Sequence, residues 1–201
     1  MNFLSIDCSI DIGTLFLKVE NKTFSKNLQS HKSSNDLLMK QILDFFNENN
    51  IKFDNISKIF VNQGPGNFSS LRASLAVAKG ISLSKNLTLF GYDTFTWSAS
   101  KFFNKKKIIY SITRFRSKYF IKSFNFNLQN SSKITEITKD EIILKLSEKF
   151  KVIPKNICKY LDSEILDLNN LNIVDLDHNM LEFLQIKGLL NEGLIKPLYL
   201  N

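Results

Sequence analysis

The sequence has few of the residues that metal sites and covalent chemistry require. Its 201 residues include two cysteines and two histidines. A zinc-type site needs several Cys or His ligands at short spacing, and neither His31 nor His178 has a second histidine three or four residues away. Cys8 and Cys158 are far apart in sequence, and we expect both to be reduced thiols that act as small core residues. We therefore predict no metal site, and both histidines are expected to be surface or hydrogen-bonded residues.

Long apolar runs are also missing. No stretch approaches the roughly 18 apolar residues that a membrane-spanning helix needs. The segment from Met1 to Asp7 has no basic portion before its apolar run, so it does not resemble a signal peptide. Hydrophobic content of 43% and charged content of 23% are ordinary for a soluble globular protein. The sequence thus predicts a cytoplasmic protein that makes no contact with a membrane.

Glycine is scarce, with seven residues and no adjacent pair. An actin-like ATPase holds phosphates with glycine-rich hairpins, because only glycine lets backbone amides come close to the oxygens. The segment D-I-G-T, from Asp11 to Thr14, is the sole candidate for such a loop, and a plain hairpin turn explains it better. Gly188 and Gly193 both fit helix ends. We therefore expect no nucleotide and no other cofactor, and an ATP-dependent enzyme is kept as an alternative.

Paired carboxylates are not found where a ribonuclease-H-type nuclease would carry them. Asp7 stands at the place of the first-strand acid, but the strand that should carry another acid ends in Asn62 and Gln63. Amides do not replace carboxylates as ligands of a hard cation. Asp7 is therefore interpreted as a relic of the fold or as a turn-forming residue. No Ser-His-Asp or Cys-His set is visible in the sequence, and we predict no catalytic residues.

One motif organises the chain, and it reads N-Q-G-P-G-N-F-S-S-L-R. It follows a short apolar run, K-I-F-V, which predicts a buried strand. Gly64, Pro65 and Gly66 end that strand, because proline offers no N–H to a ladder and glycine permits positive φ. Asn67 or Ser69 is expected to cap the helix that follows.

That helix is unusual for its small side chains. Ala73, Ala76 and Gly80 fall at i, i+3 and i+7, which leaves one face nearly bare. A glycine inside a helix costs about 1 kcal/mol relative to alanine, so the bare face requires a reason. Two interpretations stay open: close packing against the chain's own sheet, or docking of a helix from a partner.

Hydrophobic periodicity predicts three strands first, and then a helix, a strand, a helix, a strand and a helix. An antiparallel opening followed by βαβ steps is an α/β layer with right-handed crossovers, and it matches one half of an actin-like, ribonuclease-H-like architecture. We predict two lobes, residues 1–104 and 105–201, each with a mixed sheet. The second lobe is expected to hold a hairpin over residues 108–126 and further strands at residues 157–160 and 196–200.

Basic residues are mostly scattered, although the net charge is +8 and the pI about 9.4. The exception is the predicted hairpin. Arg114, Arg116 and Lys118 are interleaved there with aromatic residues, the chemistry of phosphate neutralisation and base stacking. Alternation along a hairpin explains the aromatic residues equally well, so RNA contact and an ordinary surface both stay open.

The central motif G-P-G-N-F-S-S-L-R, followed by L-A-V-A-K-G, resembles the signature of the bacterial TsaB (YeaZ) family, approximately G-P-G-S-F-T-G-L-R and L-A-x-A-K-G. The opening L-S-I-D-C-S is similar to the family's I-L-x-I-D-T-S, and the closing P-L-Y-L resembles its P-x-Y-L-R. Ser70 replaces the third glycine of the signature. The matched motif residues are Asp7, Gly64, Pro65, Gly66, Phe68 and Arg72.

The resemblance implies a two-lobed actin-like (ASKHA) fold and a scaffold subunit that is not an enzyme by itself. Members pair with the catalytic paralogue TsaD and recruit the ATPase TsaE to modify the adenosine beside the anticodon of tRNA with threonylcarbamoyl. The two first-lobe helices would dock onto the TsaD-type subunit, and tRNA would be met through the complex. The residues expected at that interface are Leu38, Ile42, Phe45, Ala73, Ala76, Val77 and Gly80. Before a partner binds, the same surface is a candidate for a homodimer.

Overall fold

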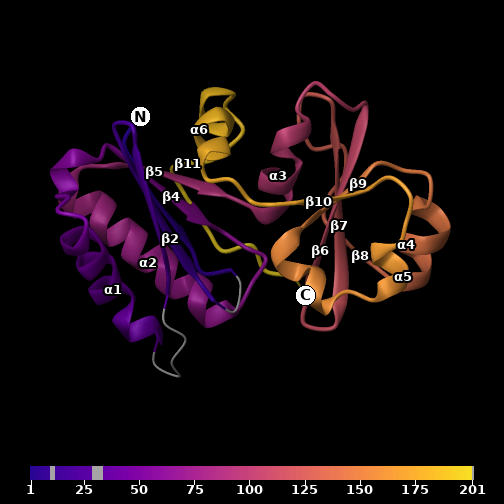
Figure 1. The fold of residues 1–201 in the computed structure, drawn as a ribbon, viewed down its shortest axis with the longest axis horizontal. Coiled ribbons are helices and arrows are strands. Elements are labelled where there is room, and N and C mark those ends of the chain that lie inside the picture. The colour runs from indigo at the N-terminus through magenta and orange to yellow at the C-terminus, as the bar shows by residue number, and fades with distance from the viewer. Residues whose placement is uncertain (10–11, 29–33, 201) are drawn as a thin grey trace. The chain divides into compact units, whose positions relative to one another are not determined.

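The structure is a computed structural model that describes the chain except for residues 10–11, 29–33 and 201 (Figure 1). The contacts divide the chain into two compact units, of which the first contains Met1–Asp93 and Leu190–Asn201 and the second contains Thr94–Leu189. In the part of the chain that the structure describes, no helix has the length and apolarity needed to cross a membrane.

The first unit contains a six-stranded mixed sheet in the order β11-β5-β4-β1-β2-β3. Strands β1, β2 and β3 are antiparallel neighbours, whereas β1, β4 and β5 run parallel, which confirms the predicted opening and βαβ steps. Helices α1 and α2 lie beside each other along the sheet (Figure 1), and their inward side chains join it in one hydrophobic core. The bounds are β1 (Phe3–Asp7), β2 (Thr14–Val19), β3 (Lys22–Asn27), α1 (Ser34–Glu48), η1 (Phe53–Asn55), β4 (Lys58–Asn62), α2 (Phe68–Lys85), β5 (Thr88–Tyr92) and β11 (Asn191–Glu192).

The second unit contains a five-stranded mixed sheet in the order β10-β9-β6-β7-β8. Strands β6 and β7 form the predicted hairpin, and β6, β9 and β10 run parallel. The bounds are α3 (Thr94–Ala99), η2 (Ser100–Phe102), β6 (Ile108–Phe115), β7 (Lys118–Asn125), β8 (Thr135–Ile137), α4 (Lys139–Leu146), β9 (Lys151–Pro154), η3 (Lys155–Tyr160), α5 (Ser163–Leu166), β10 (Leu171–Val174) and α6 (Asn179–Ile186).

The boundaries of the two units differ from the predicted lobes of residues 1–104 and 105–201. Helix α3 belongs to the second unit because all its residues are buried and it packs against β6. The end of the chain returns to the first unit, where β11 pairs with β5. Pairing between segments so distant in sequence leaves no mark in local periodicity.

Helix starts follow the capping chemistry of the sequence. The side chain of Asn67 accepts from the amides of Ser69 and Ser70 at 3.0 and 3.4 Å, so Asn67 is the cap of α2. The residues T-K-D-E at the start of α4 are typical of a capping box, and the box is present: the side chains of Thr138 and Glu141 each accept from the other's backbone amide, at 3.2 and 3.1 Å.

Two predicted strands are wrong. Residues 157–160 lie in the 3₁₀ helix η3, because β9 has already ended at the preceding proline. Residues 196–200 form no strand, since Pro197 has no amide hydrogen to contribute to a ladder. Leu198 donates instead to the carbonyl of Gln63 at 2.7 Å.

A buried lysine holds the connection between α4 and β9, and sequence reasoning missed it. Lys151 is 0% exposed, and its ammonium donates to the carbonyls of Ser147, Lys149 and Asn169 at 2.8–2.9 Å and also to that of Leu146. These acceptors include carbonyls at the end of α4, which have no partner within the helix. The ammonium therefore closes the helix end from inside the unit.

We expect Lys151→Met to lower the free energy of unfolding by about 2–4 kcal/mol, because methionine keeps the length but leaves buried carbonyls without a donor. Urea unfolding followed by circular dichroism measures the change. The exposed neighbour Lys149 offers a matched control, since Lys149→Met removes the same charge at the surface. Equal stability of the two variants would contradict the structural role of Lys151.

Candidate functional site

Helix α2 presents its bare stripe to the outside of the first unit. Ala76 and Gly80 are exposed and Ala73 is half-buried, and a Cβ atom added at Gly80 would meet nothing within 4 Å. The inward face of the helix carries the residues Leu71, Ser74, Leu75, Ala78 and Ile81. The stripe therefore does not pack against the chain's own sheet, and the interpretation that it does is wrong.

Exposed apolar side chains occur on the same helix and on its neighbour. On α2, Leu83 is 84% exposed and Phe68 is 42% exposed. On the neighbouring helix α1, Leu37, Met39 and Leu43 are also exposed. We name the surface of Ala73, Ala76, Gly80 and Leu83 the small-residue face. Its low relief lets another backbone approach closely, and its apolar atoms gain free energy when water is removed.

Three predicted interface residues on α1 lie elsewhere. Leu38, Ile42 and Phe45 are 3%, 0% and 2% exposed and belong to the core of the first unit. Side chains buried this deeply have no surface to offer a partner. Val77 of α2 is half-buried and packs against the same core. The error arose because α1 has apolar residues on both sides, and periodicity does not tell which side faces the sheet.

The Gly-Pro-Gly loop makes two close backbone approaches. Gly64 has φ +112°, and a Cβ there would lie 2.9 Å from Leu71 Cδ1 and 3.2 Å from the carbonyl of Leu198. A Cβ at Gly66 would overlap the backbone of Ser9 in the turn after β1. Both positions thus require glycine. The contact at Gly66 also leaves no space for a phosphate between the loop and Ser9.

Asp7 stabilises that same turn through hydrogen bonds. Its carboxylate is 2% exposed and accepts from the amide of Ser9 at 2.8 Å and from the Ser9 hydroxyl at 2.6 Å. Asn62 in turn donates to the Ser9 hydroxyl at 3.1 Å and accepts from the amide of Gly64 at 2.8 Å. This network agrees with the interpretation of Asp7 as a turn-forming residue. The amide of Asn62 links the end of β1 to the motif.

Gln63 ties the C-terminal segment to the motif, a role that sequence reasoning missed. Its side chain donates to the carbonyl of Lys196 at 2.6 Å and accepts from the side-chain amide of Asn191 at 2.6 Å. Its backbone accepts from Leu198 at 2.7 Å and donates to the Tyr92 carbonyl at 2.8 Å. An amide serves here because it can donate and accept at once, which a carboxylate does not.

Phe68, Arg72 and Tyr199 form a stack at the start of α2. The rings of Phe68 and Tyr199 lie 4.9 Å apart at 28°. The guanidinium carbon of Arg72 is 3.7 Å from the centroid of the Phe68 ring, and Nε donates to the Tyr199 hydroxyl at 2.9 Å. The matched motif residues Phe68 and Arg72 therefore hold the chain end beside the small-residue face.

The basic hairpin makes mostly internal contacts. Arg114 is half-buried with its guanidinium carbon 5.4 Å from the Tyr119 ring, and Lys118 forms an ion pair with Glu136 at 2.7 Å. Arg116, at φ +55°, is exposed at the turn. Tyr119 is buried in the core of the second unit, so packing within the unit accounts for it. Contact of the three cations with RNA stays a prediction.

Titratable groups do not gather into a metal site in the described part of the chain, where no group of three or more His, Cys, Asp and Glu side chains occurs. The ring of His178 lies 4.9 Å from that of Trp97. His31 and Asp11, which the sequence analysis considered, lie outside the described residues. Burial, and then the negative charge of Asp7, raises the pKa of the Cys8 thiol to about 12.

Comparison with known proteins relates the chain to one family. The family model of TsaD, tRNA N6-adenosine threonylcarbamoyltransferase, matches residues 27–112. Two proteins named "tRNA threonylcarbamoyladenosine biosynthesis protein TsaB" are similar in sequence. The one from Buchnera aphidicola subsp. Baizongia pistaciae is 29% identical over 106 residues, which are 52% of this chain and 48% of that protein. The one from subsp. Acyrthosiphon pisum is 24% identical over 173 residues, which are 84% of this chain and 78% of that protein.

Solved structures agree on the fold. The structure of YeaZ from Pseudomonas aeruginosa has a TM-score of 0.71 at 13% identity and covers 99% of each chain. A crystal structure of an uncharacterized protein with similarity to peptidase YeaZ, from the same organism, has a TM-score of 0.71 at 14% identity, covering 100% of this chain and 99% of that one. With a mixed sheet in each unit, the predicted two-lobed actin-like α/β fold is confirmed.

We expect Gln63→Ala to loosen the C-terminal segment, because it removes two side-chain hydrogen bonds to Asn191 and Lys196. The free energy of unfolding should fall by about 1–3 kcal/mol. Hydrogen exchange read by mass spectrometry should be faster in residues 190–200. The exposed Gln129→Ala variant is the control, and unchanged exchange in Gln63→Ala would show that the segment is held otherwise.

We expect Cys8 to resist thiol reagents in the folded protein, since with a pKa of about 12 only about one thiol in 10⁴ is ionised at pH 8. Labelling with iodoacetamide, followed by peptide mass spectrometry, should modify Cys158 first, because its side chain is half-buried. In urea both thiols should react at similar rates. Equal labelling rates in the native protein would contradict the burial of Cys8.

Proposed function

Because the chain belongs to the TsaB (YeaZ) family, we propose that it takes part in forming threonylcarbamoyladenosine in tRNA as a scaffold subunit without catalytic groups. Its relatives are named for that pathway, and the matching family model is that of the transferase itself. The side chains that the motif brings together bind one another, as in the network of Asp7, Ser9 and Asn62. This arrangement supports a structural motif rather than a reaction centre.

The proposed partner surface is the small-residue face of α2 with the exposed apolar residues of α1. The single observation that carries this assignment is the exposure of Ala76 and Gly80 in mid-helix, where the chain's own packing gives no reason for a bare surface. A catalytic subunit of the same fold would present two such helices. Pairing the two surfaces would let the backbones approach closely and would bury the exposed Leu83 and Leu43.

Further partners follow from the family resemblance. A TsaE-type ATPase is expected to join the paired subunits, and tRNA is expected to be bound through the complex. In the absence of the catalytic subunit, two copies of the chain can bury the same apolar face against each other as a homodimer. The Ala76→Arg variant should therefore be a monomer under conditions in which the wild-type chain forms this homodimer.

We expect Ala76→Arg to weaken binding of the TsaD-type subunit by at least about 100-fold, because a long charged side chain would have to be buried unpaired at a closely packed surface. Isothermal calorimetry with the purified subunit measures the affinity. Circular dichroism should show an unchanged fold, since Ala76 is exposed. Leu144→Arg is the matched control, because Leu144 is 78% exposed on α4 of the other unit.

Two results would contradict the proposal. Wild-type affinity of Ala76→Arg would show that the partner does not bind at the small-residue face. Unfolding of Ala76→Arg, with Leu144→Arg still folded, would show that the face is needed inside the chain. If Ala76→Arg neither forms the homodimer nor binds the catalytic subunit, one surface serves both contacts.

A further inference from the structure

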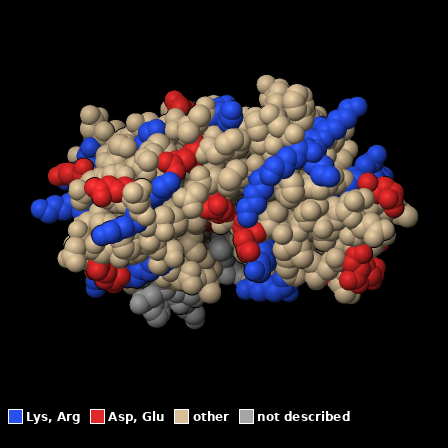
Figure 2. Space-filling model, turned by 45° about the horizontal axis from the view of Figure 1, so that its top comes forward, with Lys and Arg blue, Asp and Glu red and all other residues tan. Residues whose placement is uncertain are grey.

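The buried ammonium of Lys151 has surroundings that are unusual for a lysine. Lysine side chains ordinarily reach into water, as the Lys and Arg side chains on the face shown in Figure 2 do. Lys151, the first residue of β9, is instead 0% exposed. A buried charge is costly unless other polar groups replace the water that it loses. Oxygen atoms of the protein must therefore take the place of water around this ammonium.

Four backbone carbonyl oxygens converge on this ammonium. Those of Ser147, Lys149 and Asn169 lie 2.9, 2.8 and 2.8 Å from Nζ, and that of Leu146 also accepts from it. One oxygen comes from the last residue of α4, two come from the turn that follows, and one comes from the segment before β10. We name these four oxygens the carbonyl cage. Because an ammonium has only three N–H groups, four acceptors around one nitrogen resemble the coordination shell of an ion.

Hydrogen bonds that do not involve the ammonium also hold the carbonyl cage in place. The amide of Lys149 donates to the carbonyl of Leu146 at 3.0 Å, and the amide of Lys151 donates to the carbonyl of Asn170 at 3.0 Å. The side chain of Asn170 donates to the carbonyl of Glu148 at 3.4 Å. The backbone thus arranges the four oxygens, which lowers the entropic cost of placing a cation among them.

The ligands and distances of the carbonyl cage suit a large monovalent cation. Uncharged carbonyl oxygens are the groups that replace the water shell of K⁺ in the filters of potassium channels. The three Nζ–oxygen distances of 2.8–2.9 Å are too long for Mg²⁺ and Ca²⁺, which bind oxygen at about 2.0–2.1 Å and about 2.3–2.6 Å. None of the four ligands is a carboxylate, the group by which proteins usually hold those two ions. K⁺ and small ammonium ions therefore fit this cage better than divalent ions do.

We propose that the carbonyl cage is a monovalent-cation site, which the chain fills with its own ammonium. Lys151 supplies through a covalent tether what K⁺ or an ammonium ion would supply from solution, so the second unit needs no bound ion. In a Lys151→Ala variant the site would take an ion instead. The four heavy atoms of n-propylammonium correspond to Cγ, Cδ, Cε and Nζ of the missing side chain, and K⁺ corresponds to Nζ alone. This inference concerns the second unit and does not depend on the proposed function.

The test is urea unfolding of full-length Lys151→Ala in the chloride salts of n-propylammonium, potassium and tetramethylammonium. At 0.1 M, n-propylammonium should raise the ratio of folded to unfolded chain about 10-fold, as a ligand with a dissociation constant of about 10 mM does. The urea midpoint should then rise by about 0.5 M. Potassium should act in the same direction but less strongly, because it leaves the space of the three carbon atoms empty. Tetramethylammonium has no N–H group and should have no effect of this kind.

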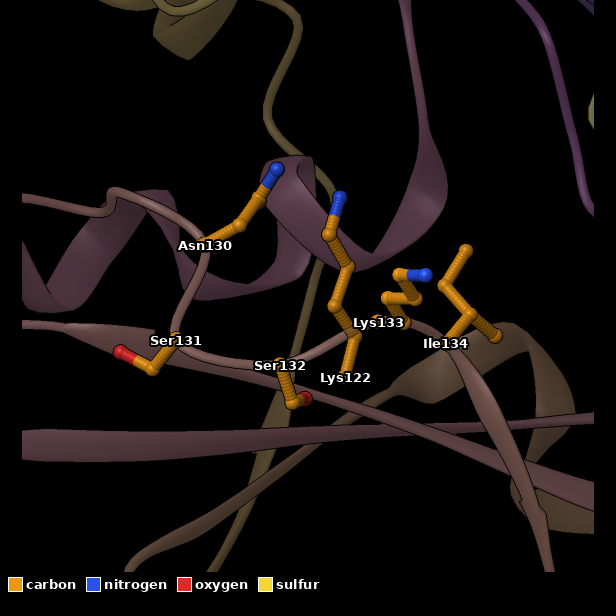
Figure 3. Close-up of a pocket in the computed structure, with 6 residues that line it drawn as sticks. All are labelled: Lys122, Asn130, Ser131, Ser132, Lys133 and Ile134. Carbon is orange, nitrogen blue, oxygen red and sulfur yellow. The ribbon is translucent and has the colours of Figure 1, made fainter.

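A local measurement and two control variants complete the test. Hydrogen exchange read by mass spectrometry should slow in residues 146–151 and 168–172 of Lys151→Ala when n-propylammonium is added. Lys151→Met is the matched control, because its longer side chain fills the vacated space, and it should respond to none of the salts. Lys133→Ala removes an exposed lysine at the pocket shown in Figure 3 and should not respond either.

Three outcomes would overturn the proposal. Equal effects of n-propylammonium and tetramethylammonium on Lys151→Ala would show a general effect of salt. Equal effects of n-propylammonium on Lys151→Ala and on Lys151→Met or the wild type would show that the ion binds elsewhere. If Lys151→Ala stays unfolded in every salt while Lys151→Met folds, the four carbonyls do not form a site for a free cation.

Discussion

The structure of the first unit depends on the close approach of three backbone segments around the Gly-Pro-Gly loop. Gly66 lies against the backbone of Ser9, and Gly64 lies against Leu198. A single added methyl group at Gly66 would separate the turn after β1 from the loop after β4. The amide side chains of Asn62 and Gln63 bind the same segments through hydrogen bonds that a carboxylate does not make in full. The loop therefore holds the turn after β1 and the C-terminal segment in fixed positions.

The Gly-Pro-Gly loop also orients α2 and so determines which face of this helix is exposed. The helix begins at its Asn67 cap immediately after the loop, and its apolar side turns onto the sheet. The remaining side is the small-residue face, flanked by the stack of Phe68, Arg72 and Tyr199. The Gly-Pro-Gly motif thus determines where α2 begins and how it leaves the sheet.

In the second unit, lysines of similar sequence context have different functions because of their surroundings. The ammonium of Lys151 donates to carbonyls at and after the end of α4 and to that of Asn169, so this lysine stabilises the fold. Lys122 is 8% exposed, and its ammonium lies 5.0 Å from the centroid of the Phe124 ring. Lys118 is neutralised by Glu136. Net charge alone treats these residues as equal, although one closes a helix end, one lies over an aromatic ring and one faces a counterion.

By itself the sequence determined the order of the elements from β1 to β5, a helix cap at Asn67 or Ser69, the capping box at Thr138, the hairpin of β6 and β7, and the motif with its requirement for glycine. These features follow from local chemistry: period, φ preference and side-chain capping. Only the tertiary structure decided that Leu38, Ile42 and Phe45 are core, that Ala76 and Gly80 are exposed, and that the chain end returns to Gln63. Burial and long-range pairing depend on which surfaces meet, and a helical or strand period specifies a face without specifying its neighbour.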